Sequence, residues 1–120
     1  MNRTILLLLS LVVITASALG TYYLNTRKTT LYNPQTANSE ELEAVSRAQQ
    51  QYVTKAKAGL DTRSGPCLDE NLMPGWVADI VHNPRVRSDD LPENECKNYL
   101  SGMAKHFVEL DLDGNVVRVQ

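Results

Sequence analysis

Several side chains with acid–base or metal-binding chemistry lie around the most apolar stretch in the second half of the chain. Asp79, His82 and Arg85 fall within the sequence WVADIVHNPR, and His106 follows further along. A carboxylate beside an imidazole can transfer protons, and two imidazoles can begin a zinc or copper site. Strand alternation within WVADIV puts Asp79 and His82 on opposite faces, so a direct pair would need a bulge between them.

The two histidines offer a second arrangement. The same alternation places His82 and His106 on the core side of their strands, where neighbouring strands could bring them together. A stable zinc or copper site would need further ligands, which only carboxylates could supply. We interpret both histidines as residues that end strands near the rim of a sheet. The alternative is a ligand or metal site made by His82, His106, Asp79 and Arg85, and no cofactor is predicted.

Cys67 and Cys96 are the only two cysteines. An even number of cysteines in an exported domain predicts a disulfide, and closing a loop of about 30 residues would stabilise the fold by roughly 3 to 4 kcal/mol. The alternative is a reactive thiol paired with His106 in a small hydrolase or transferase. The chain has no C-x-x-C, phosphate-binding glycine loop or G-x-S-x-G motif, so no catalytic residue is predicted.

The N-terminal region, residues 1–24, predicts export. Residues 5–24 carry no charge, and 20 helical residues span roughly 30 Å, the thickness of a bilayer core. Ala16-Ser17-Ala18 also matches a signal-peptidase site, which would give a secreted protein starting at Leu19. Spanning length favours the retained single-pass anchor. In both interpretations the rest of the chain is extracytoplasmic, provided that the N-terminus stays inside.

Residues 25–38 are polar and predict a linker, and residues 39–120 predict one small domain. Asn38 and Glu41 match a capping box that opens a helix of about 20 residues. That helix is predicted to bury one stripe of side chains, namely Leu42, Val45, Tyr52, Val53, Ala56 and Leu60.

The C-terminal half predicts strands. Trp76 to Val81 is almost wholly apolar, which indicates a central strand that ends at Asn83-Pro84. The two alternating runs of HFVELDLDGNVVRVQ predict a hairpin with a two-residue Asp113-Gly114 turn, in which Glu109 faces Arg118. A Gly114-Asn115 turn would shift the register by two residues and keep the faces. The predicted fold is α+β, with the long helix packed on an antiparallel sheet of three or four strands.

Four blocks of the sequence, GPCL, PGWVADIVHNPR, DDLPENEC and SGMAKHFVELDLDGNVVRVQ, carry a resemblance. They resemble a set of short bacterial proteins with an N-terminal hydrophobic segment and no established activity. The resemblance covers residues 65–120. It implies an exported bacterial domain and supplies no catalytic residue.

A net charge of −2 argues against a nucleic-acid partner, which usually requires a concentrated basic face. We therefore expect a membrane-tethered or secreted domain, not an enzyme, that acts through contacts with a protein or the cell envelope. The alternative is a small-ligand or metal-binding module, with or without catalysis, centred on His82 and His106.

Overall fold

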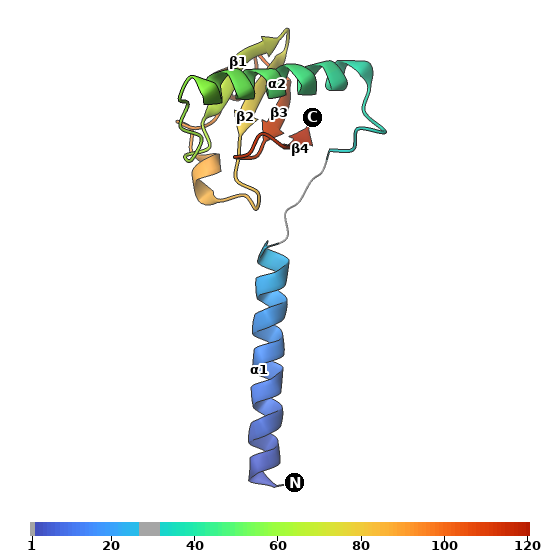
Figure 1. Ribbon diagram of the computed structural model, residues 1–120, viewed down its shortest axis with the longest axis vertical. Coiled ribbons are helices and arrows are strands. Elements are labelled where there is room, and N and C mark those ends of the chain that lie inside the picture. Colours follow the sequence, from blue (N-terminus) through green and yellow to red (C-terminus); the bar gives the residue numbers. More distant parts are fainter. Residues whose placement is uncertain (1, 27–31) are drawn as a thin grey trace.

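Helices and a four-stranded sheet make up the computed structural model, which describes residues 2–26 and 32–120 (Figure 1). The prediction of an α+β fold is confirmed. The elements in chain order are α1 (Arg3–Thr26), α2 (Ser39–Lys57), β1 (Cys67–Met73), β2 (Trp76–Ile80), the 3-10 helix η1 (Arg87–Asp90), α3 (Lys97–Leu100), β3 (His106–Leu110) and β4 (Val116–Val119).

Helix α1 is long and apolar enough to span a membrane or to serve as a signal sequence. Its residues 3–23 have a mean hydropathy of 2.2, and none of these residues is buried. Four of its hydroxyl side chains, those of Ser10, Thr15, Ser17 and Thr21, donate to backbone carbonyls of the helix itself. Ser10 donates a hydrogen bond to the Leu7 carbonyl at 2.8 Å, and Thr15 donates to the Leu11 carbonyl at 3.0 Å. Because these hydroxyls need no outside partner, they suit a hydrocarbon environment.

Helix α2 begins where the capping box predicts. The Asn38 side chain accepts a hydrogen bond from the Glu41 amide at 2.9 Å, and the Asn38 amide donates to the Glu41 carboxylate at 3.1 Å. The predicted buried stripe is only partly correct. Val45 is buried, while Leu42 and Val53 are 45% and 48% exposed. The buried face is narrower than predicted because it is built on the small side chains of Ala44 and Ala48.

The sheet has the order β1-β2-β3-β4, and α2 lies across one of its faces (Figure 1). The outer pairs are antiparallel, but β2 and β3 are parallel, so the prediction of an antiparallel sheet is wrong at its centre. The connection between them, residues 81–105, is long enough for a parallel crossover. It returns the chain to the end of the sheet where β2 began, so that His106 pairs with Trp76.

The two faces of β2 divide the interior. Trp76, Ala78 and Ile80 pack under α2, as the alternation predicts, and Val77 packs with Phe107 on the opposite face. Polar contacts also fix α2 on the sheet. The Trp76 ring N–H donates to Glu40 at 2.9 Å, Tyr52 donates to the Leu112 carbonyl at 2.7 Å, and Lys55 donates to the Leu68 carbonyl.

The predicted disulfide is present between Cys67 and Cys96, whose Cα atoms lie 4.9 Å apart. It joins the start of the edge strand β1 to the residue before α3. The predicted linker at residues 25–38 needs a correction at its C-terminal end. Residues 27–31 lie outside the described residues, but Tyr32 donates a backbone hydrogen bond to the Val117 carbonyl at 3.3 Å and packs against the core. The folded domain therefore includes Tyr32.

The C-terminal hairpin has the predicted pair Glu109–Arg118, while Leu110 pairs with Val116 and not with Val117, as a two-residue turn would require. The two-residue turn is wrong. The loop has three residues, because the Asp111 carbonyl accepts from the Gly114 amide at 3.0 Å and the Asp111 amide donates to the Asn115 carbonyl at 2.8 Å. Gly114 has a φ of 84°, the left-handed position of a three-residue hairpin loop. The Asp111 carboxylate accepts from the amides of the loop and holds it closed.

Gly114 also lies directly against Tyr52. A Cβ atom added to Gly114 would lie 2.6 Å from the Tyr52 ring, whereas one added to Gly59, which has a φ of 90°, would meet nothing within 4 Å. Both glycines therefore have a left-handed backbone, but only Gly114 contacts α2 so closely.

We expect Gly59→Ala to lower the free energy of unfolding by about 1 kcal/mol, the cost of the left-handed backbone alone. Gly114→Ala should cost about 2 to 4 kcal/mol, because the Tyr52 ring must also move. Denaturant unfolding of the full chain in non-ionic micelles, followed by the fluorescence of its single tryptophan, measures the difference. Equal losses for the two variants would contradict the packing of Tyr52 on the hairpin.

Candidate functional site

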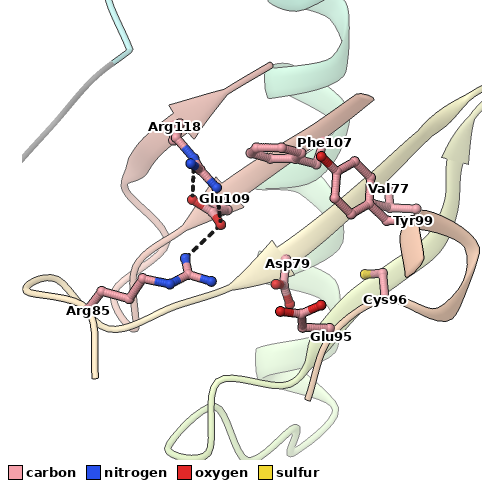
Figure 2. A pocket seen from close by; sticks show the side chains of 9 residues that line it. All are labelled: Val77, Asp79, Arg85, Glu95, Cys96, Tyr99, Phe107, Glu109 and Arg118. Atoms are coloured by element: carbon pink, nitrogen blue, oxygen red, sulfur yellow. Dashed lines mark hydrogen bonds and ion pairs between the residues drawn. The ribbon is translucent and has the colours of Figure 1, made fainter. Parts of the chain in front are cut away.

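The candidate site is a pocket on the sheet face that α2 does not cover. Strand β2 directs Val77 and Asp79 to this face, and β3 directs Phe107 and Glu109 to it. The disulfide and α3 cover part of the face. The uncovered part is a small pocket of about 70 Å³ that is open to solvent (Figure 2). Its lining residues are Val77, Asp79, Arg85, Glu95, Cys96, Tyr99, Phe107, Glu109 and Arg118.

Glu109 forms the charged centre of the pocket. Arg118 on β4 donates to both of its carboxylate oxygens, at 3.0 Å each, and Arg85 donates to it at 2.8 Å (Figure 2). The Glu109 side chain is 7% exposed, so both guanidinium groups are needed to keep its charge in place. Arg118 also lies 4.6 Å from the centre of the Phe107 ring, in a cation–π contact.

Arg85 comes from the loop after β2 and also binds Asp90 at 2.9 Å. Burial lowers the pKa of Arg85, but its hydrogen bonds to Glu109 and Asp90 more than offset that effect. Its pKa therefore lies above the usual value, and the group remains charged.

Asp79 is the least compensated charge of the pocket. The residue is 8% exposed, and the one hydrogen bond that its carboxylate accepts within the described residues comes from the Ile80 amide, at 3.0 Å. Burial raises the pKa of Asp79 to about 8. The Ile80 amide and Arg85 act in the opposite direction, and the charges of Glu109 and Glu95 raise it further. Near neutral pH the carboxyl therefore holds its proton for much of the time, and it can either give up a proton or accept a positive charge.

Glu95 contributes a second carboxyl group. It comes from the loop before α3, and Figure 2 shows its carboxyl group projecting toward the same space as that of Asp79. Within residues 2–26 and 32–120, no Lys, Arg or His pairs with either acid. The aromatic rings of Tyr99 and Phe107, 5.1 Å apart and nearly perpendicular, form the apolar wall beside them.

The structure separates the four residues that the sequence singled out as ligand candidates. Asp79 and Arg85 both line the pocket. His106 lies at the start of β3 and stacks on Trp76, with ring centres 4.7 Å apart. His82 follows the far end of β2. The expectation that neighbouring strands could bring the histidines together is wrong, because parallel pairing puts them at opposite ends of the sheet.

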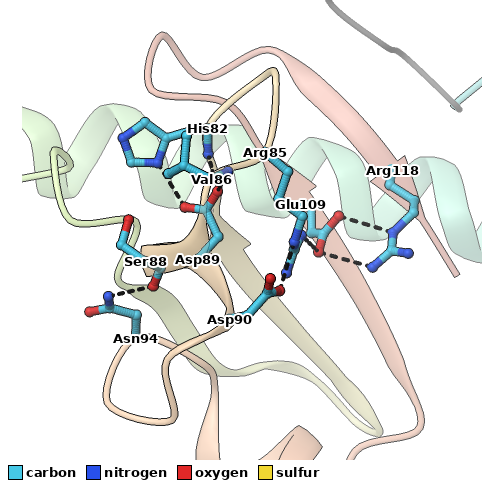
Figure 3. A network of polar contacts seen from close by, with 9 residues as sticks. All are labelled: His82, Arg85, Val86, Ser88, Asp89, Asp90, Asn94, Glu109 and Arg118. Carbon is cyan, nitrogen blue, oxygen red and sulfur yellow. Dashed lines mark hydrogen bonds and ion pairs between the residues drawn. The ribbon is translucent and has the colours of Figure 1, made fainter. Parts of the chain in front are cut away.

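His82 has a different partner, the buried side chain of Asp89 (Figure 3). Its ring Nδ1 lies 2.7 Å from Asp89, and Asp89 also accepts from the backbone amides of His82 at 3.1 Å and Val86 at 2.9 Å. Gly65 leaves room for this carboxylate, since a Cβ there would lie 2.5 Å from it. These bonds close the loop that carries Arg85 and thereby hold Arg85 toward Glu109.

One group of three metal-binding side chains lies close together in the described part of the chain, and it comprises Cys67, Glu70 and Cys96. Both sulfur atoms belong to the disulfide, so they cannot bind a metal as thiolates. For the same reason the alternative of a reactive thiol paired with His106 is not supported.

Sequence reasoning found some residues of the pocket and missed others. It paired Glu109 with Arg118 but did not include the pair among the candidate site residues. It did not single out Glu95. The usable signal was the alternation of β2 and β3, which puts Asp79 and Glu109 on the same face once the two strands are known to be neighbours. Glu95 and Tyr99 gave no such signal, because the crossover alone brings them to the site.

Comparisons of the chain with protein-family models, with curated proteins and with solved structures found no match. No property of a known family is therefore transferred to this chain.

The burial of Asp79 makes a testable prediction about stability. Protonated Asp79 is the form that the fold prefers, so its contribution to stability is complete below the usual pKa of 3.8. That contribution is lost as the pH rises toward about 8. Asp79→Asn should therefore raise the free energy of unfolding at pH 7 by about 1 to 3 kcal/mol, because the amide does not ionise and still accepts from Ile80.

The gain should disappear near pH 4 when unfolding of the full chain is followed by tryptophan fluorescence across the pH range. Asp90→Asn is the matched control, because Asp90 is exposed and paired with Arg85. It should give no gain that grows with pH. A loss of stability in Asp79→Asn at pH 7 would contradict the view of Asp79 as a costly buried charge.

Proposed function

We propose that this chain is an exported, single-pass membrane protein whose C-terminal domain acts by binding a partner group in the pocket of the open sheet face. The observation that carries the proposal is Asp79, a buried carboxyl that no cation of the described residues pairs with, which opens into a pocket lined by charged and aromatic side chains. A side chain that lowers stability and faces a pocket is typical of a functional site.

Binding is favoured over nucleophilic catalysis by the composition of the pocket. Its lining residues include no serine, threonine or histidine, and the sulfur of Cys96 is in the disulfide. A nucleophile–base pair built on a serine, threonine or cysteine is therefore not supported at this site. What the lining does offer is fixed charge and aromatic surface, the features that recognise a charged group.

The export of the domain is supported by two independent features. Helix α1 has the length and hydropathy of a membrane span, and the one disulfide is typical of an oxidising compartment outside the cytosol. The resemblance of residues 65–120 to short bacterial proteins with a hydrophobic N-terminus agrees with this placement. We propose that α1 is retained as the anchor and that the domain lies outside the cytoplasm.

Fractionation of a bacterial host that expresses the full chain tests the location. We expect the protein to stay in the membrane pellet after a carbonate wash, with an intact mass that starts at Met1. External protease should digest the domain in spheroplasts. A soluble product that starts at Leu19 would show that the segment is cleaved, and protection from external protease would contradict export.

Photo-crosslinking tests the binding face. A benzophenone amino acid is placed either at Tyr99, which is 37% exposed and lines the pocket, or at Val53, which is 48% exposed on α2. Irradiation of membranes should give a discrete adduct from position 99 and none from position 53. Equal adducts from both positions, or none from position 99, would contradict binding through the pocket.

A further inference from the structure

We propose that the pocket binds a primary ammonium group, which is held between the carboxyl groups of Asp79 and Glu95 with its alkyl stem against Tyr99 and Phe107. This inference rests on the proposed function, because it names the chemistry of the group that the pocket takes. The shared chemistry is an R–NH₃⁺ group, and its source can be a chain-terminal amine, a lysine-type side chain or an amino sugar.

The geometry around Asp79 carries the inference. The residue is more than nine-tenths buried, and the Ile80 amide occupies one of its oxygen atoms. No buried side-chain oxygen of the described residues lacks a hydrogen-bond partner. The second Asp79 oxygen, which has no such partner, must therefore reach the open space of the pocket. That space is where a ligand donor would complete its hydrogen bonding.

The other charged groups of the pocket favour a cation over an anion. Arg85 and Arg118 direct donors at Glu109, so the guanidinium groups are already committed. Among the described residues, neither Asp79 nor Glu95 is paired with such a cation. The lining contains one more acid than base, so a single added positive charge balances the pocket when every acid is ionised.

An ammonium group fits better than a divalent metal ion. Calcium and magnesium require about six or more oxygen ligands, and the walls beside Asp79 are made by Val77, Phe107 and Cys96. A primary ammonium needs only three acceptors, and two carboxyl groups with a water or the Tyr99 hydroxyl can supply them. The aromatic rings add a favourable surface for a cation and its alkyl stem.

Binding of a cation should be coupled to the loss of a proton. The charged groups that face Asp79 are Glu109 on β3, Glu95 and Arg85 in the loops, and Arg118 on β4. Because the pKa of Asp79 lies at about 8, the free pocket holds a proton near neutral pH. An ammonium ion replaces that proton, so affinity should increase with pH up to about 8 and level off above it.

The test uses the ¹⁵N-labelled full chain in non-ionic maltoside micelles, titrated with n-butylammonium while the backbone amides of Ile80 and Tyr99 are monitored by NMR. We expect saturable shifts, with an apparent Kd that falls about tenfold for each pH unit between pH 6 and 7. Butyrate, which has the same chain and the opposite charge, should give no shift at these amides. Alaninamide, Nα-acetyl-lysinamide and glucosamine then distinguish the three sources of the amine.

The decisive variant is Asp79→Asn, which should weaken binding of n-butylammonium at least tenfold and remove its pH dependence. Asp90→Asn removes a nearby negative charge that is bonded to Arg85 and lies outside the pocket lining, and it should change the Kd by less than twofold. The amide spectrum of each variant checks that it is folded. Equal weakening of binding in both variants would show that the amine is held only by general electrostatic attraction to negative charge, and it would overturn the proposal.

Two further results would also overturn it, namely shifts caused by butyrate in place of the amine, or displacement of the amine by millimolar magnesium. Failure of this proposal is distinguishable from failure of the proposed function. If no amine binds but the adduct from position 99 persists, the pocket is a binding site for different chemistry. If the adduct is absent and the amine binds, the pocket is a small-molecule site without a macromolecular partner.

Discussion

Strand β2 is the constraint on which the rest of the domain depends. All five of its residues are buried, so each of its faces must be covered or must line a site. The face with Trp76, Ala78 and Ile80 is covered by α2 and forms the larger core. The opposite face carries Val77 and Asp79, and strand geometry leaves Asp79 no route to solvent except through the pocket. The position of the carboxyl is therefore imposed by the strand that the fold needs most.

The domain can tolerate this buried acid because other contacts stabilise it independently. A chain of this size buries a limited apolar core, and its net stability is a few kcal/mol at most. The disulfide closes a loop of 29 residues, and the two guanidinium groups fix Glu109. The disulfide and the ion pairs of Glu109 lie on the same face of the sheet as Asp79. They therefore stabilise the part of the fold that surrounds the buried acid.

Local patterns in the sequence were sufficient to predict the local structure. Four predictions are confirmed, namely the capping box at Asn38, the alternation in β2, the disulfide and the Glu109–Arg118 pair. The disulfide was predicted from the even number of cysteines in a domain expected to be exported. The other three depend on residues that lie close together in the sequence. The parallel pairing of β2 and β3 was missed. Strand direction here depends on the path of residues 81–105 across one face, and no short motif encodes that path.

The same crossover explains why the pocket could not be predicted as a whole. It brings Glu95 and Tyr99 over β2 and β3, and it moves His106 away from His82. The sequence therefore identified Asp79 and Arg85 as chemically interesting but paired them with the wrong residues. Long-range topology decides which side chains meet, while alternation decides only which face they occupy.

A pocket this small contacts few atoms of any ligand, and a single charged group cannot supply high affinity by itself. Under the proposed anchoring, high affinity is not required. A domain held at a membrane by α1 meets other membrane or envelope components at an effective concentration that is far higher than for free diffusion, on the order of millimolar for short linkers. Weak recognition of one group can then be sufficient, and the buried acid supplies selectivity for charge. The anchor and the pocket thus have complementary roles. The anchor raises the frequency at which the domain meets a partner, and the pocket determines which charged group is bound.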